Sequence, residues 1–562
     1  MGYRTLAMLS AGLLLVAGFQ ALAVQEAPPP GADMRFRIVD DTTPSQRDSS
    51  STADHTKFKE LQGPFADGPA VTRACLACHT EAGKHVQESI HWTWEYTDPR
   101  SGAKLGKRHL VNTFCTNARG NEGMCAQCHA SYGWDEKNDF GPAGLKWQER
   151  VDAGSDEHVD CLVCHDRSGG YYKVPPTEGN EACSVMFEGK APIDLVKVAQ
   201  NVGAPGRENC GACHFYGGGG DGVKHGDLDS SLKRPNRALD VHMDADGLNF
   251  ACSQCHVSDR HRWAGSRYNI TAKDTEGTGK PGMRRDVATC ESCHGLQPHR
   301  NDAVARVKLN DHVDRVACQT CHIPAMARGG VATMTEWDWR TAGRTKNGEG
   351  YKEHDYTQGD GKHRDTYKSI KGSFIYGENL TPHYAWFDGQ MQYKTIDTRF
   401  DPTQGPVAVN GFSGAAANPE ARIWPFKRMQ TVQPYDKGNN TLVYMHLWGD
   451  DEDAYWGNYD FGRAIRAGME RGGLPYSGEY GFVETLSYWP ITHMVAPKEN
   501  ALACNECHSR DGRLDELKDF YLPGRDGRWL DWIGLLLVGG ALLGVSGHAL
   551  LRVWSAKGRA AA

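Results

Sequence analysis

The chain has 562 residues, with 63 basic and 70 acidic side chains and a formal net charge of −7. This mild charge says nothing about partners by itself, but the sequence has no basic stripe, so nucleic-acid binding has no support. Hydrophobic residues make up only 39% of the chain and 65 residues are glycine. We therefore expect a loop-rich protein rather than one built on thick aliphatic layers.

The N-terminal residues predict export. Arg4 precedes an apolar run over residues 6–21, and Ala21-Leu22-Ala23 has the small-x-small pattern of a cleavage site. Residues 1–23 are therefore predicted to be a signal peptide, with an N-terminal membrane anchor as the alternative. Residues 24–60 are predicted to be a flexible linker, because this stretch is rich in Pro, Asp, Ser and Thr and poor in apolar side chains.

Eight Cys-x-x-Cys-His motifs follow, and they account for sixteen of the eighteen cysteines. They are Cys75/Cys78/His79, Cys125/Cys128/His129, Cys161/Cys164/His165, Cys210/Cys213/His214, Cys252/Cys255/His256, Cys290/Cys293/His294, Cys318/Cys321/His322 and Cys504/Cys507/His508. The two thiols of such a motif bond the vinyl groups of a c-type haem, and the imidazole normally takes one face of the iron. We expect eight covalently attached haem c groups in a body spanning residues 61–525. The histidine after every pair excludes a disulfide scaffold and a zinc ribbon.

The fold class predicted from this spacing is a multihaem cytochrome c fold that is mostly α and irregular, with haems forming much of the core. Seven motifs lie between residues 75 and 322, so we expect haems within electron-transfer distance of one another. Residues 323–503 are rich in tryptophan and are predicted to be a folded, partly helical section. One helix is expected over residues 463–471, stopped by Gly472 and Gly473, and another is expected to begin between Asp515 and Tyr521.

Sixteen histidines lie outside the motifs, enough to give most irons a second imidazole. Iron with two imidazoles is low-spin and suits electron transfer. The predicted distal ligands are His91, His109, His158, His225, His242, His261, His299, His312 and His493. Each of them could instead be an ordinary surface or hydrogen-bonded histidine. His55, His354 and His363 are set aside because they lie in polar stretches.

The C-terminal segment predicts a membrane anchor. Residues 533–551 contain no Asp, Glu, Lys or Arg, and at about 1.5 Å per residue they match the hydrocarbon thickness of a bilayer. We predict a transmembrane helix over residues 530–554 and a cytoplasmic tail over residues 555–562, because basic residues follow the span. A buried core helix is the alternative. His548 lies inside the span and is either a functional side chain or an interfacial one.

Several stretches of the body resemble the octahaem tetrathionate reductase family, and the resemblance covers most of residues 70–515. They are Phe114-Cys115, Cys125-Ala-Gln-Cys-His129-Ala-Ser-Tyr-Gly-Trp134, Val159-Asp-Cys161-Leu-Val-Cys-His165-Asp, Lys224-His225-Gly-Asp-Leu, Ala317-Cys-Gln-Thr-Cys-His-Ile-Pro324 and Ile491-Thr-His-Met-Val-Ala-Pro497. The resemblance implies that seven motif histidines bind iron, whereas the haem on Cys125 and Cys128 takes a lysine in place of His129. Between His129 and Phe140 the lysine is Lys137.

A lysine that binds iron must be a neutral amine, and burial beside a metal ion lowers the pKa of such an amine. Asp135 and Asp139 flank Lys137, and either could orient the amine or exchange protons. Cys115 could place a thiol near the substrate, form a disulfide with Cys183, or do neither.

The resemblance implies an exported oxidoreductase with a periplasmic body, anchored in the cytoplasmic membrane, that reduces a small oxyanion such as tetrathionate while seven further haems relay electrons. The reverse reaction is equally open. Hydroxylamine or nitrite reduction is the enzymatic alternative, and a non-catalytic conduit between quinol and periplasmic acceptors is the alternative of another class. Arg108 and Arg119 are candidates for the cationic walls that an anionic substrate needs. Gly540 and Gly544 suit helix packing against a cytochrome b-type, quinone-linked partner.

Overall fold

The computed structural model describes residues 52–107, 109–111, 117–118, 120–121, 129–131, 156–171, 193–275, 287–300, 303–449 and 451–560. All of them belong to one compact unit, residues 38–562. Other predicted features lie outside the described residues and stay predictions: the signal peptide, most of the linker, Arg108, Cys115, Arg119, Cys125, Cys128, Asp135, Lys137, Asp139 and Cys183.

Short helices form around the haem attachment motifs. Positions i, i+3 and i+4 lie on one face of a helical turn, so one turn brings both thiols and the imidazole of a motif to the same side. A hydrogen bond from the histidine amide to the first cysteine's carbonyl closes this turn, at 2.9 Å from His79 to Cys75 and 2.8 Å from His508 to Cys504. The helices up to residue 322 are η1 (His55–Lys57), η2 (Lys59–Leu61), α2 (Gly68–Leu76), α3 (Ala82–Gln87), α4 (Ile90–Thr93), η4 (Asp156–His158), α7 (Leu162–His165), α8 (Leu195–Gln200), α9 (Arg207–His214), η5 (Ser230–Lys233), η6 (Cys252–Gln254), α10 (Cys290–His294), α11 (Ala303–His312) and α12 (Cys318–His322).

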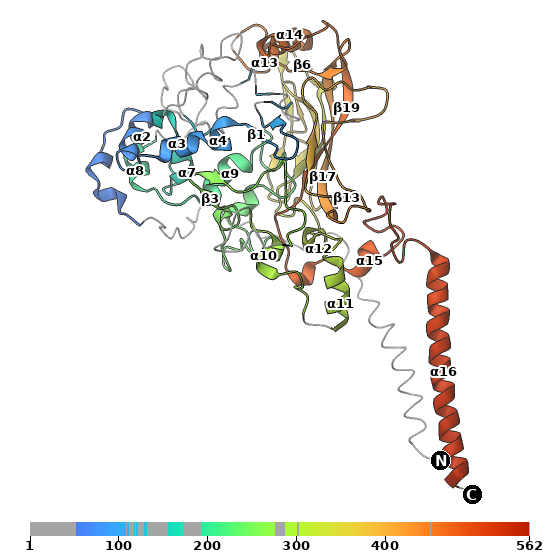
Figure 1. Ribbon diagram of the computed structural model, residues 1–562. Coiled ribbons are helices and arrows are strands. Elements are labelled where there is room, and N and C mark those ends of the chain that lie inside the picture. The colour runs from blue at the N-terminus through green and yellow to red at the C-terminus, as the bar shows by residue number, and fades with distance from the viewer. Residues whose placement is uncertain are drawn as a thin grey trace. The chain divides into compact units, whose positions relative to one another are not determined.

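A nine-stranded sheet occupies most of the section between the seventh and eighth motifs. Its strands are β5 (Thr333–Asp338), β8 (Lys352–Glu353), β11 (Tyr367–Lys368), β12 (Gly372–Gly377), β13 (His383–Phe387), β15 (Val407–Ala408), β17 (Arg422–Asp436), β18 (Thr441–Leu442) and β19 (Tyr480–Pro490). The main order is β15-β19-β17-β5-β12-β11-β8, and β13 and β18 also pair with β17. Figure 1 shows β13, β17 and β19 side by side.

Strand β17 is the central strand of this sheet and pairs with four others, β5, β13, β18 and β19. It pairs antiparallel with β19 from Phe426↔Pro490 to Asp436↔Tyr480, and parallel with β5. The structure is 29% helix and 20% strand, so the mostly α and irregular fold that the sequence predicted is not what the structure shows. Most of β17 is buried on both faces, which removes the alternation of apolar and polar residues that marks a strand in sequence. Pro425 and Pro434 also lie within it, and proline argues against a strand.

The remaining strands form small two-stranded sheets. They are β1 (Tyr96–Thr97) with β2 (Lys104–Leu105), β3 (Ser258–Asp259) with β4 (Arg262–Trp263), β6 (Thr345–Lys346) with β7 (Glu349–Gly350), β9 (Tyr356–Thr357) with β10 (His363–Arg364), and β14 (Met391–Tyr393) with β16 (Asn410–Phe412).

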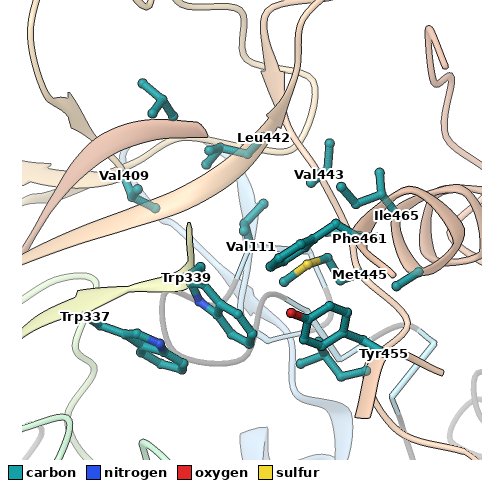
Figure 2. Close-up of a cluster of buried hydrophobic side chains, with 14 of the residues drawn as sticks. Val111, Trp337, Trp339, Val409, Leu442, Val443, Met445, Tyr455, Phe461 and Ile465 are labelled. Atoms are coloured by element: carbon teal, nitrogen blue, oxygen red, sulfur yellow. The ribbon is translucent and has the colours of Figure 1, made fainter. Parts of the chain in front are cut away.

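The largest hydrophobic cluster packs the sheet against α13 (Tyr455–Asn458) and α14 (Phe461–Arg471) (Figure 2). Trp337 and Trp339 stack with ring centroids 4.9 Å apart, and Tyr455 contacts Phe461 at 4.5 Å. Buried aromatic pairs of this kind add stabilisation beyond the area that they remove from water. Trp337 and Trp339, two of the tryptophans that indicated a folded section, therefore lie in a hydrophobic core beside the sheet and not in a mainly helical section. The one helix at this point, η7 (Trp339–Thr341), is a single turn long.

Helix α14 confirms the helix predicted over residues 463–471, with its first turn starting two residues earlier. Asp460 caps it by accepting a hydrogen bond from the Arg463 amide at 3.1 Å. The helix ends at Arg471, and Gly472 follows as its C-cap, as the glycine pair predicts. Residues 515–521 form a turn at 515–516 followed by irregular chain with a bend at 519–520, and not the start of a helix.

Two short helices, η8 (Lys498–Asn500) and α15 (Cys504–Cys507), precede the last helix, α16 (Arg528–Ala560). Within α16, residues Trp529–Ala556 are long and apolar enough to cross a membrane, and none of this stretch is buried inside the protein. At 1.5 Å per residue it is about 42 Å long, more than the hydrocarbon core requires. The predicted boundaries 530–554 lie inside it.

Candidate haem sites

Three pairs of attachment motifs meet through the first cysteine of each motif. The thiols of these first cysteines lie close enough to shift each other's pKa: Cys75 with Cys161, Cys210 with Cys252, and Cys290 with Cys318. Motifs that lie apart in the sequence thus have adjacent attachment points in the fold.

The second cysteine of each motif is also predicted to bond haem. The contacts between motifs involve only the first cysteines, so the second cysteines are described separately. Cys78 is exposed, whereas Cys164, Cys213 and Cys255 are partly covered by the protein. The amides of Cys78 and Cys255 donate to the carbonyls of the first cysteine of their own motif, both at 3.1 Å. The motif cysteines in the described part of the chain form no disulfide, which agrees with thiols that bond haem. The attachment of haem to Cys78, Cys164, Cys213 and Cys255 stays a prediction.

Histidine rings also approach one another in pairs, and the separations fall in a narrow range. The ring centroids lie 6.2 Å apart for His91–His214, 6.1 Å for His242–His294, 6.2 Å for His256–His493, 6.3 Å for His299–His322, 6.0 Å for His312–His508, 6.3 Å for His165–His261 and 6.2 Å for His85–His261. The first six pairs each join one motif histidine to one histidine outside the motifs, and His261 occurs both in the sixth pair and in the seventh.

This separation fits one metal ion between two imidazoles. A metal–imidazole bond is about 2.0–2.1 Å long, so two such bonds and two ring radii place the centroids about 6.3 Å apart. The protein also orients several of these rings through Nδ1. The Nδ1–H groups of His165, His256 and His508 donate to the carbonyls of Gly203, Ala264 and Pro523 at 2.9, 3.1 and 3.1 Å. A bond of this kind sets the tautomer in which Nε2 carries the lone pair for a metal.

Buried donors with no partner in the described part of the protein fit the same interpretation. They include Nε and Nη2 of Arg422, Nε of Arg328, and the indole nitrogens of Trp386 and Trp424. Buried donors are nearly always satisfied in folded proteins, and haem propionates are strong acceptors. The residues present therefore fit haem groups.

The structure brings together most, but not all, of the predicted distal ligands. His91, His242, His261, His299, His312 and His493 each lie in an imidazole pair. Among the described residues, His109, His158, His225 and the motif histidine His79 have no such ring contact; His109 instead pairs with Glu95, at 2.7 Å. His85 in α3, six residues after His79, also lies in an imidazole pair and was not among the predicted ligands. Iron ligation by the predicted histidines stays a prediction.

His129, the histidine of the second motif, differs from all the paired rings. It is completely buried, and both ring nitrogens contact protein oxygens: Nε2 lies 2.5 Å from the carbonyl of Trp92, and Nδ1 lies 2.5 Å from Oγ of Ser131. A carbonyl can only accept, so Nε2 carries the proton and Nδ1 accepts from the Ser131 hydroxyl. An imidazole nitrogen that carries a proton has no lone pair for iron. The ring of Trp94 packs against His129 at 5.0 Å.

Hydrogen bonds join residues 120–121, before the second motif, to the loop that follows β18. Asn121 accepts from the Leu447 amide at 2.7 Å and donates to the Met445 carbonyl at 2.8 Å. His446, which the sequence analysis also missed, lies in this loop and bonds the Gly120 carbonyl at 2.7 Å and Asp451 at 2.8 Å. Burial raises the pKa of the Asp451 carboxyl, but the hydrogen bond and charge of His446 outweigh it and lower that pKa. The loop thereby holds the chain that leads to His129.

The fold as a whole matches a solved structure. An octahaem cytochrome c from Shewanella oneidensis superposes with a TM-score of 0.67 and 38% sequence identity, over 82% of this chain and 95% of that one. This chain belongs to the octahaem cytochrome c family. It therefore carries covalently bound haem c and takes part in redox chemistry, as a multihaem oxidoreductase or an electron conduit.

Two further comparisons found similar sequences, and the first of them also names a cytochrome c family. Residues 334–511 match the family described as bacterial cytochrome c, a range that includes nearly all of the large sheet. An uncharacterized protein of Archaeoglobus fulgidus is 25% identical over 222 residues, or 38% of this chain and 67% of that protein.

One imidazole pair of this octahaem cytochrome has a carboxylate beside it. Nδ1 of His493 lies 3.1 Å from Asp227, which also accepts from the amides of Thr492 and His493. Burial raises the pKa of the Asp227 carboxyl, but the hydrogen bond and charge of His493 outweigh it and lower that pKa. Asp227 is therefore a carboxylate at neutral pH.

We expect Asp227→Asn to raise the midpoint potential of one haem by on the order of tens of millivolts, because a carboxylate on a ligand imidazole increases its electron donation to ferric iron. A spectroelectrochemical titration of all haems measures the shift. Asp453→Asn is the matched control, because this carboxylate is 48% exposed and lies in a surface ion pair with Arg463, and it should leave all haem potentials unchanged. Identical titration curves for Asp227→Asn and the unmodified protein would contradict the prediction.

Proposed function

We propose that this octahaem cytochrome is an oxidoreductase that carries eight haem c groups and reduces a small oxyanion at the haem attached to Cys125 and Cys128. Tetrathionate, S₄O₆²⁻, is the substrate suggested by the family resemblance. Two electrons cleave its central S–S bond and give two thiosulfates, S₂O₃²⁻, so the reaction consumes no proton. Haem supplies the electrons one at a time.

The observation that carries this proposal is the state of His129. Its Nε2 proton is donated to the Trp92 carbonyl, which supports a second haem whose iron is not held by His129. A different side chain then has to hold that iron, and Lys137 is the proposed ligand. An iron bound on one side only by an amine is left with a coordination position for a substrate.

The neighbouring residues have proposed roles that follow from their chemistry. Asp135 or Asp139 orients the amine of Lys137 by accepting its hydrogen bonds. Arg108 and Arg119 supply positive charge for a dianionic substrate. Cys115 either faces this site as a thiol or pairs with Cys183.

The paired imidazoles specifically favour the second candidate function, a conduit without a substrate of its own. Six-coordinate irons with two imidazoles transfer electrons but offer no binding position. The two functions differ in one property: a catalytic protein has an iron that accepts a small ligand, whereas a conduit has none.

We therefore expect one iron in eight to bind cyanide readily. Resting-state EPR should show one signal distinct from the low-spin signals of the imidazole-paired irons, and a cyanide titration should change that signal alone. Saturation at one equivalent per protein supports the oxidoreductase. A titration in which no iron responds supports the conduit and contradicts the proposed function.

The proposal extends to location and partner. We place the haem body in the periplasm and α16 in the cytoplasmic membrane, supported by the length and apolar composition of Trp529–Ala556. The proposed partner is an integral, cytochrome b-type protein that oxidises quinol, packed against Gly540 and Gly544. His548 would then lie near the cytoplasmic end of the span, within reach of the quinone or a haem propionate of that partner.

A further inference from the structure

The eighth attachment motif is the one joined most directly to the membrane helix. Its cysteines lie in α15, and residues 509–527 connect it to α16, as Figure 1 shows. Cys504 is exposed, and the paired rings of His508 and His312 are only partly covered by the protein. The geometry of this connection decides how far the eighth haem can lie from the membrane.

The connecting segment is folded back onto the body and packed. Leu514, Leu517 and Leu522 are buried in one cluster with Tyr384 of β13. Arg525 binds two backbone carbonyls of the same segment. Its Nη1 donates to the Leu514 carbonyl at 2.6 Å, and its Nη2 donates to the Phe520 carbonyl at 2.9 Å. Its side chain is only 5% exposed. The segment is therefore a fixed part of the haem body rather than a loose tether.

The end of this segment contacts the haem ligand itself. Nδ1–H of His508 donates to the Pro523 carbonyl at 3.1 Å. Gly524 follows with φ +83° and packs against the backbone of His508, where a Cβ would collide with the His508 carbonyl. Only glycine fits this position without strain. Pro523 and Gly524 thus hold the chain directly behind the His508 ring.

The distance from this contact to the membrane helix has an upper limit set by the backbone. Five residues lead from Pro523 to Arg528, and a fully extended chain of that length spans at most about 18 Å. The real path is shorter, because the amides of Arg525 and Asp526 both donate to the Leu522 carbonyl at 3.2 and 2.9 Å and turn the chain. This limit holds at any angle between α16 and the body.

We propose that electrons enter this protein at the haem attached to Cys504 and Cys507, donated by a membrane-embedded, quinol-oxidising partner of α16. The inference rests on the membrane attachment and partner proposed above. Oxidation of one quinol to quinone releases two protons and two electrons, and each electron reduces one ferric haem to the ferrous state. The short link keeps this haem within reach of the membrane surface.

The same region connects the eighth attachment motif to the seventh and sixth, which gives electrons a path into the body. The Leu502 amide donates to the Cys321 carbonyl at 3.0 Å, so the chain before the eighth motif lies on the seventh. Arg513 ties the two further, donating to the Pro324 carbonyl at 2.6 Å and to Glu506 at 2.8 Å. The first cysteines of the seventh and sixth motifs, Cys318 and Cys290, are themselves neighbours. Attachment points therefore follow one another from the eighth motif into the body.

The test moves the body away from the membrane without removing the anchor. A rigid helical spacer of four Glu-Ala-Ala-Ala-Lys repeats between Asp526 and Gly527 adds about 30 Å. In proteoliposomes with the partner and quinol, we expect haem reduction to slow at least tenfold, while turnover with a reduced viologen stays unchanged. In nanodiscs, ferric haem should enhance the spin relaxation of nitroxide-labelled lipid headgroups with the unmodified protein, and the spacer should abolish this enhancement.

The matched control carries the same spacer between Ala556 and Lys557, beyond the membrane span, and should behave like the unmodified protein. Deletion of residues 530–562 distinguishes a wrong point of electron entry from a wrong membrane partner. If deletion abolishes quinol-linked reduction but the Asp526–Gly527 spacer leaves its rate or the headgroup relaxation unchanged, the point of electron transfer is wrong and the membrane partner stands. If deletion leaves quinol-linked reduction intact, the membrane partner and this inference both fall.

Discussion

Replacing Lys137 with alanine is expected to lower turnover with tetrathionate or hydroxylamine by about 100-fold or more. The substitution removes the proposed amine ligand, but Cys125 and Cys128 still bond the porphyrin, so the haem content should not change. EPR should show the imidazole-paired haems unaltered and one haem with new coordination. The His129 ring can take the empty place only by giving up its hydrogen bond to the Trp92 carbonyl.

Lys137→Arg is not expected to restore activity, because guanidinium stays protonated and cannot donate a lone pair to iron. Lys59→Ala serves as the control, since this lysine is 91% exposed and pairs with Glu60, at 3.7 Å. Steady-state kinetics and EPR of the three variants separate loss of a ligand from loss of a charge. A Lys137→Ala protein with an unaltered haem spectrum and near-normal turnover would show that His129 binds iron and that the proposed site is wrong.

Arg422→Met is expected to destabilise the haem-loaded protein by about 3–5 kcal/mol. Arg422 in β17 forms an ion pair with Glu291, and the two side chains are only 2% and 7% exposed. Glu291 lies inside the sixth attachment motif, between Cys290 and Cys293, so this pair joins a haem site to the sheet. Removing the arginine leaves a buried carboxylate without its counter-ion, and guanidinium denaturation followed by far-UV circular dichroism measures the cost.

The double variant Arg422→Met/Glu291→Met should recover part of this loss, because it leaves no uncompensated charge. Arg237→Met tests the specificity of the effect. Arg237 pairs with Glu499 at a surface where both side chains are more than half exposed, so its loss should cost less than about 1 kcal/mol. Equal destabilisation by Arg422→Met and Arg237→Met would mean that the buried ion pair contributes no more to the free energy of unfolding than the exposed one.

The sequence by itself determined the haem attachment chemistry and several local elements. A Cys-x-x-Cys-His motif needs only one helical turn to bring its groups together, so its meaning does not depend on distant residues. The end of helix α14 was equally readable, because Gly472 and Gly473 act on the backbone next to them, whereas its cap Asp460 was not recognised and the predicted start was two residues late. The apolar C-terminal helix was predicted for the same reason: its length and composition are local properties.

Only the tertiary structure decided the large sheet, the pairing of the imidazoles and the state of His129. Strand β17 is buried on both faces and contains two prolines, so its strand character comes from β5, β13 and β19 rather than from its own pattern. His493 meets His256, and His312 meets His508, across long stretches of chain, and nothing near either residue specifies the partner. For His129, the deciding groups are the backbone carbonyl of Trp92 and the hydroxyl of Ser131. A backbone carbonyl leaves no signal in the sequence, because every residue has one and the fold alone decides which of them faces a given ring.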